Sequence, residues 1–72
     1  MMEPTTLNQV GMLLECADLE SNGYVCVIKH TEENWWFLKY RHRSNGRTLT
    51  VQWRYDKYTI KEGNLILKSI GE

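Results

Sequence analysis

Apolar and polar residues alternate along two consecutive stretches of the chain, residues 35–43 and 47–55, and this pattern predicts two β-strands. Between them lies Asn45-Gly46, a dipeptide typical of type I′ hairpin turns because both central positions of that turn need a positive φ. We therefore expect one β-hairpin folded at this dipeptide. Its expected partners are Tyr40 with Val51, Lys39 with Gln52, Leu38 with Trp53 and Trp36 with Tyr55.

The expected hairpin has two different faces, because successive side chains of a strand point in opposite directions. One face is apolar and is expected to pack on a core: Trp36, Leu38, Tyr40, His42, Leu49, Val51, Trp53 and Tyr55. The other is basic and hydroxyl-rich, with Trp35 at its end: Phe37, Lys39, Arg41, Arg43, Thr48, Thr50, Gln52 and Arg54. A slip of one residue would expose the apolar set to water, so the pattern strongly favours this assignment of faces.

The residues before the hairpin predict a helix at about 5–20 and a buried strand at 24–29. Thr5 or Thr6 suits the N-cap of the helix, and Gly23 suits a left-handed residue after its end. Apolar residues recur at steps of three and four and are expected to face the core: Leu7, Val10, Leu14 and Ala17, flanked by Leu13. Two shorter strands are expected after the hairpin, at 58–60 and 65–70.

This order of elements predicts a single small α+β domain over residues 1–72, with the helix at about 5–20 and the β-sheet at about 24–70. An N-terminal helix is followed by a small antiparallel meander of 4–5 strands. Short strands joined by tight turns favour either an SH3-like barrel or a sheet covered by the helix. The order resembles that of Sm-like and other SH3-like barrels, although the Gly-centred strand motifs of the Sm family cannot be placed on these residues.

Charge changes the picture more than composition does. The chain is 42% hydrophobic, which favours a packed domain over disorder, and its formal net charge is zero. However, residues 1–34 carry six acids and one base, whereas residues 35–72 carry eight bases and three acids. Such asymmetry indicates a charged partner, or else an acidic helix that offsets a basic hairpin within one fold.

Two cysteines, Cys16 and Cys26, are too few for a disulfide framework. The first 20 residues lack the basic and apolar regions of a signal peptide. No apolar run approaches the roughly 20 residues of a membrane-spanning helix. We therefore expect a cytoplasmic protein with reduced thiols and no membrane association.

Neither a metal site nor a catalytic site is expected. The soft ligands Cys16, Cys26, His30 and His42 show no CxxC or HxxxH spacing. The chain contains no nucleophile elbow and no Gly-rich phosphate loop, because its five glycines stand singly. The sequence therefore predicts a protein that is not an enzyme and needs no cofactor.

The basic face of the hairpin suggests a binding function. A positive strand face with aromatic residues at one end is typical of proteins that hold single-stranded nucleic acid. The candidate stacking residues are Trp35 and Phe37, and the candidate phosphate contacts are Lys39, Arg41, Arg43, Arg47 and Arg54. The alternative is a protein-interaction or homo-oligomeric module without nucleic-acid binding, anchored by Trp35 and Phe37 and by Met12 and Leu19 on the helix. An ordinary solvated strand face is the third interpretation.

Overall fold

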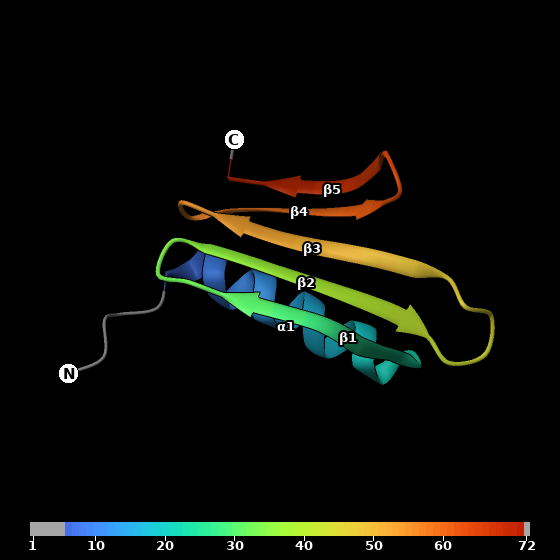
Figure 1. Cartoon of the computed structure of the whole chain (residues 1–72). Helices are drawn as coiled ribbons and strands as arrows, with labels where there is room; N and C mark the ends of the chain where they lie inside the picture. The colour runs from blue at the N-terminus through green and yellow to red at the C-terminus, as the bar shows by residue number, and fades with distance from the viewer. Residues whose placement is uncertain (1–5, 72) are drawn as a thin grey trace.

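The computed structural model describes residues 6–71 and contains one helix and one antiparallel sheet (Figure 1). The elements are α1 (Leu7–Ser21), β1 (Tyr24–Thr31), β2 (Trp35–His42), β3 (Thr48–Arg54), β4 (Lys57–Glu62) and β5 (Leu65–Ile70). The five strands are hydrogen-bonded in the order β1-β2-β3-β4-β5. α1 lies behind the sheet in Figure 1. We call the side that faces α1 the helix side and the opposite side the outer side.

The predicted α+β class, with an N-terminal helix and an antiparallel sheet, is confirmed. The predicted SH3-like barrel is wrong, because β1 and β5 are the two edges of an open sheet within the described residues. A barrel closes only when its edge strands pair, which requires the sheet to curl strongly on itself. Here α1 lies on the side toward which the sheet would have to curl, and it covers the apolar side chains instead.

The core lies between α1 and the helix side of the sheet. It consists of ten buried residues: Met12, Cys16, Tyr24, Leu38, Tyr40, Leu49, Val51, Trp53, Tyr58 and Ile60. The apolar face predicted for the hairpin is therefore on the helix side, except for Tyr55, which lies in a turn and is exposed. His42 lies at the core edge, where its ring meets that of Tyr24 at 4.9 Å and its Nδ1 accepts the backbone N–H of Ser44.

The register of the β2–β3 hairpin differs from the prediction by two residues. Leu38 pairs with Val51, and Tyr40 pairs with Leu49. The chain turns through residues 43–46, a longer turn in which Gly46 has φ 73° and donates its N–H to the carbonyl of His42. Since side chains alternate with a period of two, a shift of two residues changes the partners but leaves every side chain on its predicted side.

Side chains within this turn explain why it is longer than a type I′ turn. The Nδ1 of His42 accepts the N–H of Ser44 at 3.1 Å, and the Oδ1 of Asn45 accepts the N–H of Arg47 at 2.8 Å. In the longer turn these two N–H groups are bound by side-chain acceptors, whereas a two-residue turn would place both in the strand ladder. Arg43 therefore belongs to the turn, and its predicted place on the basic strand face is wrong.

A two-residue turn with positive φ at both positions does occur, between β3 and β4. Tyr55 has φ 49° and Asp56 has φ 67°. Its surroundings hold it by three hydrogen bonds: Tyr55 N–H to the carbonyl of Asn34 at 3.0 Å, Asn8 Nδ2 to the carbonyl of Asp56 at 3.0 Å, and Thr6 Oγ1 to the Asp56 carboxylate. Thr6 is also the N-cap of α1, as predicted, and accepts the N–H of Gln9.

The orientation of α1 is opposite to the prediction. The stripe expected in the core points away from the sheet, with Leu7 89% and Leu14 65% exposed. Met12, fully buried, and Leu19, packed against the core, face the sheet instead. The alternative that used Met12 and Leu19 as an outer contact surface is therefore wrong.

Three contacts join the inward side of α1 to β4 and β5. Gly11 lies against Tyr58 of β4, and a Cβ there would be 3.5 Å from Tyr58 Oη, an ordinary van der Waals distance. Tyr58 Oη donates to the Glu15 carboxylate at 3.3 Å, and Lys68 of β5 forms an ion pair with the same carboxylate. These polar contacts lie on the side of α1 that faces β4 and β5, whereas Leu7 and Leu14 lie on the opposite side.

Candidate functional site

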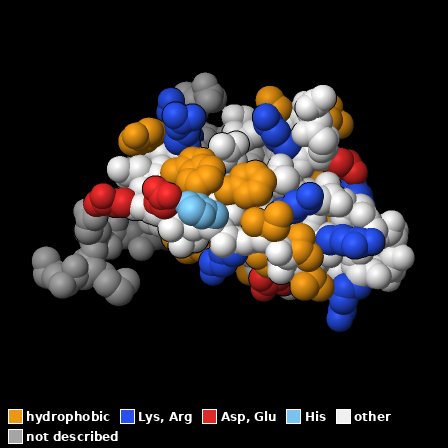
Figure 2. Space-filling model, viewed as in Figure 1, with side chains coloured by type: hydrophobic (Ala, Val, Ile, Leu, Met, Phe, Trp, Pro, Cys, Tyr) orange, Lys and Arg blue, Asp and Glu red, His pale blue; other side chains and the backbone are white. Residues whose placement is uncertain are grey.

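The outer side of the sheet carries most of the predicted binding residues. On β2, Trp35, Phe37, Lys39 and Arg41 alternate with the buried residues of the helix side. Their partners on β3 are, in the same order, Arg54, Gln52, Thr50 and Thr48. Figure 2 shows this side, with apolar side chains gathered beside a histidine, Lys and Arg around them, and acids at one end. Five of the seven predicted nucleic-acid contacts thus share one surface.

An aromatic group occupies one end of this surface. The Trp35 and Phe37 rings are stacked, with centroids 6.4 Å apart and planes at 21°. His30 of β1 lies opposite Phe37, and its ring centroid is 4.9 Å from that of Trp35. His30 was not expected here, because its placement depends on how β1 pairs with β2. We call His30, Trp35 and Phe37 the aromatic group.

β4 adds two bases that were not predicted as contacts. Lys57 pairs with Arg54, and Lys61 pairs with Thr50. Arg54 and Lys57 also line a common depression of about 340 Å³ with Gln52 and Thr59. The outer side therefore carries five basic side chains, which we call the basic group: Lys39, Arg41, Arg54, Lys57 and Lys61.

The other two predicted phosphate contacts lie elsewhere. Arg47 is two residues before the buried Leu49, and its guanidinium binds Glu62 on the helix side through bonds of 2.7 and 2.8 Å. This bond holds the pKa of Glu62 below its ordinary value. Arg43 is exposed in the 43–46 turn, where it lines a depression of about 410 Å³ together with Arg41 and Val25 and thus borders the strand surface. Neither arginine belongs to the strand surface where the sequence placed it.

The charges are separated between the two sides. On the helix side, Arg47 pairs with Glu62 and Lys68 pairs with Glu15. Within residues 6–71, no member of the basic group has a carboxylate within ion-pair distance. The outer side therefore presents uncompensated positive charge although the chain as a whole is neutral.

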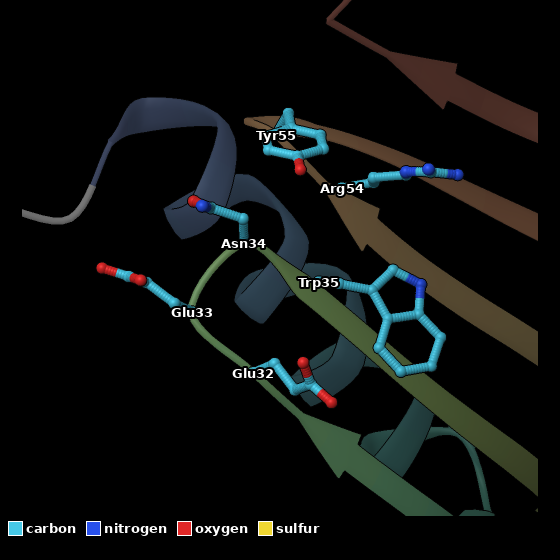
Figure 3. Close-up of a pocket in the computed structure, with 6 residues that line it drawn as sticks. All are labelled: Glu32, Glu33, Asn34, Trp35, Arg54 and Tyr55. Atoms are coloured by element: carbon cyan, nitrogen blue, oxygen red, sulfur yellow. The ribbon is translucent and has the colours of Figure 1, made fainter.

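Acidic residues border the aromatic end. A depression of about 490 Å³ is lined by Glu32, Glu33, Asn34, Trp35, Arg54 and Tyr55 (Figure 3). In Figure 3 the Glu33 side chain points away from Trp35 and Arg54. Glu32 accepts a bond from His30 at 2.8 Å. An anionic ligand is therefore attracted to the basic group and repelled beyond Trp35.

The described residues contain no other evident site. Among them, no three His, Cys, Asp or Glu side chains are grouped so as to hold a metal ion. Burial raises the pKa of the Cys16 thiol, which keeps it protonated at neutral pH. The helix that the structure describes is too short and too polar to cross a membrane.

Comparisons with protein-family models, with curated proteins and with solved structures find no match to this chain. Its function is therefore argued from the geometry and charge of the outer side.

Proposed function

We propose that the chain is a non-catalytic module that binds single-stranded nucleic acid on the outer side of its sheet. One observation carries the proposal: the basic group and the aromatic group share one side of the sheet, opposite α1. Within residues 6–71, none of the five basic side chains forms an ion pair. Lys and Arg neutralise phosphates, whereas flat rings stack on bases.

The geometry favours single strands over duplexes. Trp35 and Phe37 lie with their planes at 21°, and a base can stack on such rings only when it is unpaired. The Lys and Arg side chains are interspersed with Thr48, Thr50, Gln52 and Thr59. Hydroxyl and amide groups both donate and accept hydrogen bonds, so they can adapt to different ligand geometries. We therefore expect binding with weak sequence preference.

The direct test is fluorescence anisotropy with labelled single-stranded RNA, single-stranded DNA and duplex DNA at several salt concentrations. Binding to the single strands should weaken as salt rises, with a log–log slope of about −0.7 per neutralised phosphate. The double substitution Arg41→Gln and Arg54→Gln should weaken binding and flatten the slope by about 1.4.

Arg47→Gln is the matched control, because Arg47 is an arginine of the same hairpin that faces the helix side. Its substitution should leave affinity and slope nearly unchanged. Absence of binding to every probe at low salt would overturn the proposal. So would an equal loss for Arg47→Gln and the double variant.

A protein contact anchored by Trp35 and Phe37, the alternative function, predicts another response. Its affinity would depend on the two rings and would change little when Arg41 and Arg54 lose their charge. The same double variant therefore separates the two functions.

A further inference from the structure

α1 is apolar on two opposite sides. Met12, Cys16 and Leu19 face the sheet and are buried in or packed against the core. Leu7 and Leu14 point directly away from it and are 89% and 65% exposed. A surface helix normally carries one apolar stripe, and a helix with two is expected to be covered on both sides. Within the described residues, nothing covers the outward stripe.

The spacing of the outward stripe is that of a helix–helix seam. Its members, Leu7, Val10, Leu14 and Ala17, follow one another at steps of three, four and three. These are successive a and d positions of a heptad, which pack into the grooves of a second helix. The stripe extends about 15 Å along the helix axis.

The charges of α1 indicate which helix fits. α1 has no acid in its first turn and no base in its last turn. Asp18 and Glu20 lie near its C-terminal end, where the helix dipole disfavours negative charge. In an antiparallel pair of identical helices, these acids lie beside the uncharged first turn of the other helix, where the dipole favours them. A parallel pair would set acids against acids.

We propose that two copies of the chain associate about a two-fold axis through antiparallel α1 helices. The assembly has four layers in the order sheet, helix, helix, sheet, and the two outer sides face away from each other. The dimer therefore leaves both proposed nucleic-acid surfaces open and does not depend on that function. A single helix face is smaller than the roughly 800 Å² per partner of standard interfaces, so we expect a dissociation constant of roughly micromolar.

Sedimentation velocity of the full chain, from about 1 µM to about 1 mM, tests the dimer. The wild type should pass from monomer to dimer in this range. Leu14→Glu should raise the dissociation constant at least about 100-fold, because it places a charge in the seam. Leu7→Glu should act in the same direction. Circular dichroism should show an unchanged fold, since both side chains point to solvent in the monomer.

Leu65→Glu is the matched control. Leu65 is 63% exposed, close to the value for Leu14, but it lies on the edge strand β5. This variant should dimerise like the wild type. A wild type that stays monomeric at about 1 mM would overturn the proposal. A dimer lost in Leu65→Glu but kept in Leu14→Glu would overturn it too, by placing the contact at the sheet edge.

Disulfide trapping tests the orientation. In an antiparallel seam, Val10 of one copy lies beside Leu14 of the other. Chains carrying Val10→Cys and Leu14→Cys, both with Cys26→Ser, should form mixed disulfides faster than either forms disulfides with itself. Faster self-linkage of Leu14→Cys would indicate a parallel pair and overturn the proposed arrangement.

Discussion

Met12 and Leu14 are two residues apart on α1 and face opposite sides of it, Met12 the core and Leu14 the solvent. Met12→Ala should lower the free energy of unfolding by about 2–5 kcal/mol, because it leaves a cavity under the helix. Leu14→Ala should change it by less than about 0.5 kcal/mol in dilute solution, where the monomer prevails. Urea unfolding measures both. A larger loss for Leu14→Ala would mean that α1 is rotated toward the stripe first expected from its spacing.

The strained turn between β3 and β4 predicts a stabilising substitution. Tyr55 has φ 49°, a conformation that Asn adopts more readily than a bulky aromatic residue. Tyr55→Asn should therefore raise the free energy of unfolding by about 0.5–1 kcal/mol. Tyr55→Val should lower it, because a β-branched residue fits this conformation poorly. Thermal unfolding of both variants gives the comparison, and equal destabilisation would show that contacts of the Tyr55 ring outweigh the strain.

The ion pair of Arg47 and Glu62 predicts a pH dependence. Arg47 lowers the pKa of Glu62 from its ordinary 4.5, so the folded state favours the carboxylate. The stabilisation is therefore complete above pH 4.5 and is lost as pH falls through the folded pKa. Glu62→Gln should be less stable than wild type at neutral pH and should converge with it in acid. Glu33→Gln, at the exposed 32–34 turn, should show no such convergence.

The two thiols should react in a defined order. Cys16 is buried on the sheet-facing side of α1, and burial raises the pKa of its thiol. Cys26 is half-buried on the edge strand β1. A thiol reagent should modify Cys26 in the native protein and Cys16 only after unfolding. Peptide mapping after short exposure identifies the modified residue. Rapid native modification of Cys16 would contradict the close packing of α1 on the sheet.

Base stacking can be separated from charge. Trp35→Ala or Phe37→Ala should each lower affinity for single-stranded RNA by roughly 1–3 kcal/mol without changing the salt slope, because no phosphate contact is lost. Leu65→Ala is the control, since Leu65 is exposed on β5, where it pairs with Glu62, and lines neither depression beside Trp35 and Arg54. Quenching of Trp35 fluorescence should accompany binding. Equal losses for all three variants would show that no stacking site is localised there.

The alternation of residues predicted which side of the sheet each side chain occupies, but not which residues of β2 and β3 pair with each other. The two-residue period places Leu38 and Lys39 on opposite sides whatever the register, and this prediction is confirmed. The register itself depends on hydrogen bonds that the His42 ring and the Asn45 side chain make in the turn. The dipeptide Asn45-Gly46 alone does not indicate that these side-chain bonds form.

The orientation of α1 could not be predicted from its spacing, because the helix has two stripes of comparable period. In the structure Glu15 contacts Tyr58 and Lys68, which are more than forty residues away in the chain. Lys57 and Lys61, by contrast, were within reach of sequence reasoning. Both lie two residues from Thr59, so extending the short predicted strand in either direction places them on the outer side.

The turn at residues 43–46 has a consequence for how this protein tolerates changes of length. Side chains alternate between the two sides of the sheet with a period of two. If two residues were added to or removed from this turn and the pairing of β3 with β2 shifted by two, every side chain would stay on its present side. A single inserted residue that shifted the pairing would instead turn the strand over. This turn is therefore a natural place for grafted peptides, provided that they are added in pairs.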